Sequence, residues 1–102
     1  MNVIARSTLK AFWTNPSYKD SEQPLKSWYA EARAANWTGP QDIKDQYSSA
    51  SIIGNNRVVF NIKGNDYRLI VAVAYEYGAV YVKFLGTHKQ YDKVDAATVE
   101  MD

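Results

Sequence analysis

The pattern of apolar and polar residues between residues 57 and 92 predicts three strands joined by tight turns. Val58, Phe60 and Ile62 occupy every second position, which is typical of a strand with one buried face. Residues 64–65, Gly-Asn, supply the positive φ that a two-residue hairpin turn needs. These features predict a β-hairpin at the start of this stretch.

The next two predicted strands carry isolated cations among apolar and aromatic residues. Residues 67–75 are apolar through their middle, so we expect both faces of this strand to be covered. After a turn at Gly78 the alternation resumes, and it places Lys83 on the same face as Tyr81 and Leu85. The whole stretch therefore predicts an antiparallel meander.

The first third of the chain predicts a short strand and two helices. Residues 2–5 favour an edge strand, and Ser7 is a suitable N-cap for a short helix that ends at Asn15-Pro16. A second helix is expected from about residue 20 to residue 36, with Pro24 in its first turn. Its apolar stripe consists of Leu25, Trp28, Tyr29, Ala32 and Ala35, which we interpret as core.

The order of these elements predicts an α+β fold. Residues 41–50 are polar and indicate a loop or one helical turn, and residues 51–53 favour a short strand. We therefore expect one domain over residues 1–102, with two N-terminal helices packed on one face of a twisted, mainly antiparallel sheet of about four strands. The opposite sheet face should be open or covered by a partner.

The composition is that of an ordinary soluble protein, with 46% hydrophobic and 23% charged residues. The absence of cysteine excludes disulfides and thiol chemistry, which agrees with a reducing compartment. Because neither a signal peptide nor a stretch of transmembrane length is present, we expect a cytoplasmic protein without a membrane partner.

Charge is distributed unevenly along the chain, although the net charge is only +1. Residues 57–93 hold six cations against three anions, whereas the tail from residue 94 holds Asp95, Glu100 and Asp102 and no cation. Positive charge is thus predicted to concentrate on the sheet, next to an acidic end. A solvated surface with random asymmetry would give the same numbers.

Motifs for common cofactors are absent. One histidine and no cysteine give no zinc-ligand spacing, and neither a phosphate-binding glycine loop nor a nucleophile elbow is present. We therefore expect neither a metal nor another cofactor.

The remaining polar groups suit a phosphodiester. Cleavage of RNA without a metal needs a proton acceptor for the 2′-OH, a proton donor for the leaving oxygen, and cations for the phosphate. His88 is suited to proton transfer because its ordinary pKa lies near neutrality. Tyr91 or Asp92 would assist, and candidate phosphate contacts are Lys63, Arg68 and Lys83.

Each candidate also has a purely structural interpretation. A lone surface histidine is more often incidental than catalytic, and Arg68 is about as well explained by pairing with a carboxylate. The Asn65 side chain can instead hydrogen-bond to the backbone of its own turn, and Asp92 can cap a helical turn. Residue types and spacing alone therefore leave the function open.

Two runs of sequence resemble a known family. Residues 57–69 (RVVFNIKGNDYRL) and residues 82–92 (VKFLGTHKQYD) are similar to the HigB toxins of type II toxin–antitoxin systems, a branch of the RelE-like mRNA interferases. Weaker similarity extends over the N-terminal helices. The Asn, Gly-Asn and Arg before the central strand, with Gly-Thr-His and Tyr-Asp after the last one, are specific in combination.

The resemblance implies a RelE-like fold and a toxin that enters the ribosomal A site and cuts translated mRNA without a metal. It also implies a cognate antitoxin, a helix-turn-helix DNA-binding protein. Carried onto this chain, His88 becomes the leading acid or base, Tyr91 and Asp92 its partners, and Arg68 and Lys83 transition-state contacts. The implied RNA-backbone contacts are Lys63, Asn65, Lys89 and Arg57. The alternative is a non-catalytic module that binds RNA or protein on the same scaffold, or a degenerate toxin kept only for its antitoxin contact.

Overall fold

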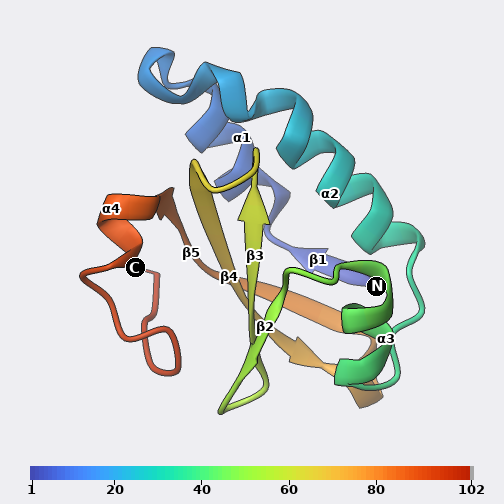
Figure 1. Cartoon of the computed structure of the whole chain (residues 1–102). Helices are drawn as coiled ribbons and strands as arrows, with labels where there is room; N and C mark the ends of the chain where they lie inside the picture. The colour runs from blue at the N-terminus through green and yellow to red at the C-terminus, as the bar shows by residue number, and fades with distance from the viewer. Residues whose placement is uncertain (102) are drawn as a thin grey trace.

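The computed structural model describes residues 1–101 and contains a five-stranded mixed sheet in the order β1-β5-β4-β3-β2 (Figure 1). β1 runs parallel to β5, and the other neighbours are antiparallel. The strands are β1 (Asn2–Ile4), β2 (Ser51–Ile53), β3 (Arg57–Ile62), β4 (Tyr67–Ala74) and β5 (Ala79–Thr87). The α+β class is confirmed. The sheet is one strand larger than predicted because both short runs, at residues 2–4 and 51–53, pair at its edges.

The helices differ in detail from the predicted ones. They are α1 (Arg6–Thr14), α2 (Glu22–Ala34), α3 (Pro40–Gln46) and α4 (His88–Tyr91), with 3₁₀ turns η1 (Pro16–Ser21) and η2 (Tyr75–Tyr77). Ser7 is not the N-cap of α1, because the extended residue before the helix is Ala5. The predicted loop at residues 41–50 contains α3, which Pro40 begins because its fixed φ suits a first helical position.

The core lies between the sheet and the two long helices, α1 and α2 (Figure 1). Leu25, Trp28 and Ala32 of the predicted stripe on α2 are buried, whereas Tyr29 and Ala35 are only partly covered. The middle of β4 (residues 69–71) is fully inaccessible, so the prediction that both its faces are covered is confirmed.

A bulge in β5 decides which way the cation of that strand points. Ile70 pairs with Phe84 but Val71 pairs with Val82, so Lys83 is the extra residue. Lys83 stays with Tyr81, its ammonium 5.9 Å from the ring centroid. The bulge sends Leu85 to the helix side, where it packs on the core, so the prediction that Leu85 shares a face with Lys83 is wrong.

The β3–β4 turn is longer than predicted, with four residues between Ile62 and Tyr67. The left-handed conformation is adopted by Lys63 (φ 53°) and Gly64 (φ 63°), not by Asn65. The positive φ therefore begins one residue earlier than the Gly-Asn signal indicated.

The sheet face opposite α1 and α2 is covered by the chain itself. After α4 the chain doubles back along this face (Figure 1). We call residues 95–101 the C-terminal strap. Under it Arg57 is only 7% exposed. The expectation that this face is open or covered by a partner is therefore wrong for its central part. Separately, no helix within residues 1–101 is long and apolar enough to cross a membrane.

Candidate functional site

The short helix α4 is anchored tightly to the end of β5. Thr87 caps it, accepting a hydrogen bond from the Gln90 backbone N–H, and the Gln90 side chain accepts one from the Thr87 N–H in return. A side chain at Gly86 would place its Cβ 2.6 Å from Gln90 Oε1, so glycine is needed for this close approach. The backbone N–H of His88 also donates to the Asp66 carbonyl. These bonds hold α4 beside the start of β4.

Arg68 meets Tyr91 at this junction. Its guanidinium carbon lies 5.5 Å from the centroid of the Tyr91 ring, and Nη1 donates to the Asn65 carbonyl at 3.1 Å. Both side chains are partly exposed. The two residues are thus brought together as the site prediction required, whereas Asn65 takes part through its backbone. None of the bonds to Arg68 comes from a carboxylate within residues 1–101, so its charge is available to an anion.

His88 and Asp92 lie one helical turn apart on the exposed side of α4. His88 Nε2 is 3.5 Å from Asp92 Oδ2, and both side chains are about half exposed (49% and 59%). A carboxylate at this distance can orient the imidazole. Asp92 is also the C-cap residue of α4, where its backbone N–H donates to the carbonyls of His88 and Gln90. Lys89 is exposed on the same helix.

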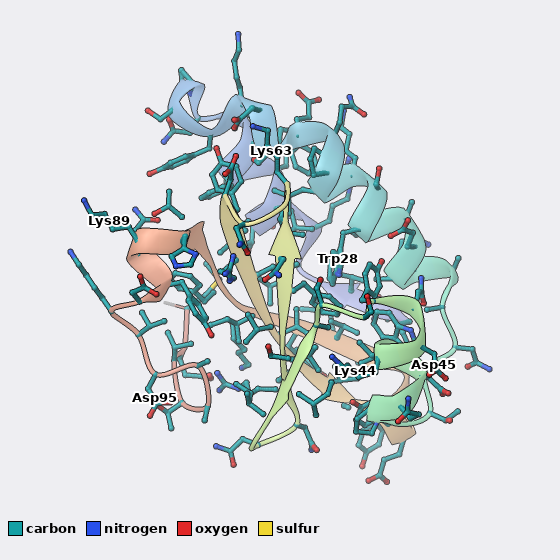
Figure 2. All side chains as sticks on the ribbon, viewed as in Figure 1. Trp28, Lys44, Asp45, Lys63, Lys89 and Asp95 are labelled. Atoms are coloured by element: carbon teal, nitrogen blue, oxygen red, sulfur yellow. The ribbon has the colours of Figure 1, made fainter. Side chains whose placement is uncertain are left out.

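Lys63 is exposed, and it is held in two ion pairs. Its ammonium lies 3.0 Å from Asp20 of η1 and 3.1 Å from Asp66 of its own turn. The hydrogen bonds to Asp20 and Asp66 raise the pKa of Lys63. This arrangement ties the hairpin to the helical layer, and Figure 2 shows Lys63 at that end of the molecule. The structure therefore gives the predicted RNA-backbone contact a structural role.

Tyr67 belongs to the same cluster and donates its hydroxyl hydrogen to Asp20. Burial, followed by the bond to Asp20, raises the pKa of Tyr67 to about 12. An unfolded tyrosine ionises near pH 10. Between these values the unfolded chain binds fewer protons than the folded one, so stability falls as pH rises.

We therefore expect the free energy of unfolding to decline between pH about 10 and pH about 12. Tyr67→Phe should flatten part of this decline, leaving the parts due to Tyr47, Tyr75 and Lys63, whose pKa values are also raised. Urea denaturation at several alkaline pH values measures the slope. Tyr77→Phe is the control, because Tyr77 is 81% exposed, and a slope equally changed by both substitutions would contradict the assignment.

Arg57 and Lys83 share one carboxylate on the strap. Arg57 Nη2 lies 2.8 Å from Glu100 Oε2, and Lys83 Nζ lies 2.9 Å from Glu100 Oε1. Arg57 Nη1 donates further to the carbonyls of Ala96 and Val99. The hydrogen bond from Lys83, then the charges of Lys83 and Arg57, lower the pKa of Glu100.

Arg57 is separated from the Arg68–Tyr91 junction. Arg57 pairs with Ala72 of β4. Ala72 lies four residues from Arg68 along the strand, which corresponds to about 13 Å. Lys83 projects between them from the bulge that follows Val82. The predicted residues therefore form two groups on one sheet face: Arg68 with Tyr91, His88 and Asp92, and Arg57 with Lys83 beneath the strap.

A second basic region was missed by sequence reasoning. A cavity of about 500 Å³ beside α1, η1 and α2 is lined by Arg6, Lys10, Trp13, Thr14, Lys19, Glu22 and Lys26. Positive charge therefore gathers in a second place besides the sheet, where the sequence distribution predicted its concentration. The i, i+4 spacing of Arg6 and Lys10 was the only local signal, because Lys19 and Lys26 reach the cavity through the fold.

The polar side chains at the Arg68–Tyr91 junction can donate or accept protons and can bind an anion. Within residues 1–101, no three His, Cys, Asp or Glu side chains come together in a way that would bind a metal ion. The Arg68–Tyr91 junction combines a cation, a phenol, an imidazole and a carboxylate at the edge of one sheet face.

Comparison with known proteins gives one family. No curated protein matches the chain significantly. The model of the HigB toxin, described as the RelE-like toxic component of a toxin–antitoxin system, matches residues 21–94. The match includes α2, α3, α4 and all strands except β1, and it ends before the strap. The chain belongs to the HigB family, and is thus the RelE-like toxic component of a toxin–antitoxin system with a cognate antitoxin as its partner.

Proposed function

We propose that this toxin is a ribosome-dependent endoribonuclease that cleaves translated mRNA by metal-independent attack of the 2′-OH. The observation that carries the proposal is the Arg68–Tyr91 contact beside the His88–Asp92 pair, on the sheet face away from α1 and α2. It supplies a cation for a phosphate together with groups that transfer protons. Family membership supports the same class of activity.

In the proposed reaction, the 2′-oxygen attacks the neighbouring phosphorus and the bond from phosphorus to the 5′-oxygen breaks. The 2′-OH proton passes to a base, and the departing 5′-oxygen receives a proton, which leaves a 2′,3′-cyclic phosphate and a 5′-hydroxyl. His88 transfers protons, with Asp92 orienting the imidazole or sharing that role. The Arg68 guanidinium stabilises the negative charge that grows on the phosphorane, and Tyr91 positions it.

The substrate, the antitoxin type and the location are proposed from the same contact and from membership of the HigB family. mRNA in the ribosomal A site is the proposed substrate, and the antitoxin is proposed to be a helix-turn-helix DNA-binding protein. Lys89, exposed on α4 beside His88, is proposed to contact the RNA backbone. The cytoplasm, where translation occurs, is the proposed location.

Inducing the chain in a bacterial host beside its His88→Ala variant tests this function. We expect the parent chain to arrest growth and to produce new mRNA 5′ ends inside translated reading frames, and the variant to do neither. Lys93→Ala is a control that removes an exposed cation just after α4, a residue with no role in the proposed reaction, and it should leave the arrest unchanged. Arrest that survives His88→Ala would move proton transfer to another group, and soluble, folded protein without arrest would contradict the enzyme.

A non-catalytic binding module is a second candidate because carboxylates already hold three of the predicted cations, Lys63, Lys83 and Arg57. Such a module would tolerate His88→Ala and would lose its partner on charge reversal of Arg68. The induction experiment separates the two candidates, because only the enzyme produces new 5′ ends that depend on His88.

A further inference from the structure

The strap is fixed to the sheet by four polar contacts. The Asn55 side chain donates to the Ala97 carbonyl at 2.8 Å, and Arg57 donates to the carbonyls of Ala96 and Val99. The fourth contact is the carboxylate of Glu100, which both Arg57 and Lys83 bind. Because the chain crosses from the turn before β3 to Lys83 in β5, the strap lies over the central strand β4.

The strap has an internal turn that shapes it for this position. Asp95 accepts hydrogen bonds from the backbone N–H groups of Ala97, Thr98 and Val99, the first through its side chain and the others through its carbonyl. The turn leaves the carbonyls of Ala96, Ala97 and Val99 facing β3 and its preceding turn. Beyond Glu100, Met101 lines a cavity of about 360 Å³ together with Leu85 and residues of α1 and η1.

Glu100 presents two anionic oxygens, and a different cation binds each one. Oε2 receives the Arg57 guanidinium and Oε1 receives the Lys83 ammonium. Two non-bridging oxygens of a phosphodiester have the same charge-bearing arrangement and accept the same donors. Arg57 and Lys83 therefore form an anion-binding site, and Glu100 of the same chain occupies it.

The exposure of the three side chains shows that this occupant can be exchanged. Glu100 is 57% exposed, whereas Lys83 is 24% and Arg57 only 8% exposed. A half-exposed ion pair is weak because water and salt screen it. Arg57 belongs to β3 and Lys83 to β5, so both cations remain on the sheet when the carboxylate leaves.

We infer that Arg57 and Lys83 form a binding site for an RNA phosphate, and that the C-terminal strap occupies this site through Glu100 and competes with RNA. The inference rests on the proposed function, because that function makes RNA the anion that reaches this sheet face. The Arg57 end of this site lies about 13 Å from Arg68 along the sheet, so a phosphate bound there would be about two nucleotides from the scissile bond. The strap therefore acts as an intramolecular inhibitor whose local concentration is high because it is tethered at α4.

The strap lies outside the part of the chain that the family model matches, whereas the proposed catalytic groups lie inside it. The match ends at residue 94, after His88, Tyr91 and Asp92, so the strap lies outside the matched region. Changes in the strap can therefore alter RNA binding without altering the side chains proposed to perform the chemistry.

Glu100→Gln is the variant that tests the inference, because it keeps the shape of the side chain and removes its charge. The probe is a 2′-O-methyl RNA oligonucleotide, which cannot be cleaved because it lacks the attacking hydroxyl. We expect the dissociation constant, measured by fluorescence anisotropy at low salt, to fall by about tenfold relative to the parent chain. The matched control is Glu76→Gln in η2, which removes the same charge from an exposed residue outside the strap and should change the constant less than about twofold.

A crosslink gives an independent test that does not depend on removing the strap. The chain has no cysteine, so cysteines introduced at Asn55 and Ala97, which are in contact, can be joined specifically by a short thiol crosslinker. The joined protein should bind the oligonucleotide more weakly than the same variant left unjoined. Equal binding by the two forms, or equal effects of Glu100→Gln and Glu76→Gln, would overturn the inference.

The outcomes for the strap and for the proposed function are distinguishable. Growth arrest by the parent chain, with RNA binding unaffected by Glu100→Gln, would reject the strap and retain the endoribonuclease. Tighter RNA binding by Glu100→Gln, with no cleavage by any variant, would retain the anion site and reject the enzyme.

Discussion

Arg68→Ala is expected to lower the rate of mRNA cleavage by about a hundredfold to a thousandfold, the range seen when one transition-state contact is removed. The guanidinium is the cation at the Arg68–Tyr91 junction, and no carboxylate within residues 1–101 bonds to it. It can therefore bind the charge that develops on the phosphorane. Single-turnover cleavage of mRNA on programmed ribosomes measures the rate.

The fold should survive this substitution. Arg68 contributes one hydrogen bond to the Asn65 carbonyl and one contact with the Tyr91 ring, each worth about 1 kcal/mol or less at a partly exposed site. We expect the circular dichroism spectrum to be unchanged and the unfolding midpoint to fall by a few degrees only. A large fall would mean that lost activity reports on folding instead.

Two further variants separate charge from geometry. Arg68→Lys keeps the positive charge but loses the planar fork that binds two phosphate oxygens, so we expect an intermediate rate. Arg33→Ala removes an exposed arginine from the end of α2, on the helical layer, and should leave the rate within about twofold of the parent. If Arg68→Ala cleaved as fast as Arg33→Ala, Arg68 would have no role in the chemistry.

The sequence pattern predicted the strands, and it placed the residues of the proposed site on neighbouring elements, because both depend on local pattern. The alternation around Val58, Phe60 and Ile62 predicted β3, and the apolar middle of β4 predicted its burial on both faces. Arg68 and Tyr91 were both candidates. Antiparallel pairing of β4 with β5 places Arg68 opposite Gly86, at the base of α4, so the meander itself brings the two together.

The sequence pattern could not predict ion pairs between residues that lie far apart in the chain. Lys63 pairs with Asp20, and Arg57 pairs with Glu100, each across 43 positions of sequence. No periodicity links such residues, and an isolated cation on a strand looks the same whether it faces solvent or a carboxylate. The acidic tail and the basic sheet were both noticed, yet only the structure shows that one lies on the other. Asp102, the last member of that predicted tail, lies outside the described residues.

The bulge at Lys83 explains why the predicted face of Leu85 was wrong. A strict alternation assigned Lys83 and Leu85 to one face, but the extra residue in β5 reverses the faces beyond Lys83. Leu85 then packs against the core while Lys83 reaches Glu100. One irregular position, which has no clear signal in the sequence, thus decides that Lys83 belongs to the anion site under the strap.

Phe60→Ala is expected to reduce the free energy of unfolding by about 3–5 kcal/mol, the usual range for a buried aromatic. Phe60 is 1% exposed, and its ring lies 5.4 Å from that of Trp28, 6.2 Å from Trp37 and 5.1 Å from Tyr47. These neighbours come from α2, the segment after it, and the end of α3. One ring on β3 therefore joins three separate parts of the chain.

Because total stabilities of small domains are about 5–15 kcal/mol, a loss of this size leaves a marginal protein. Urea denaturation followed by tryptophan fluorescence is a suitable measurement, since Trp28 and Trp37 contact the altered position directly. Tyr77→Ala, at an 81% exposed residue, should change the same quantity by less than about 0.5 kcal/mol. If Phe60→Ala cost less than about 1 kcal/mol, the cavity would have to collapse, and collapse requires α2 and α3 to move toward β3.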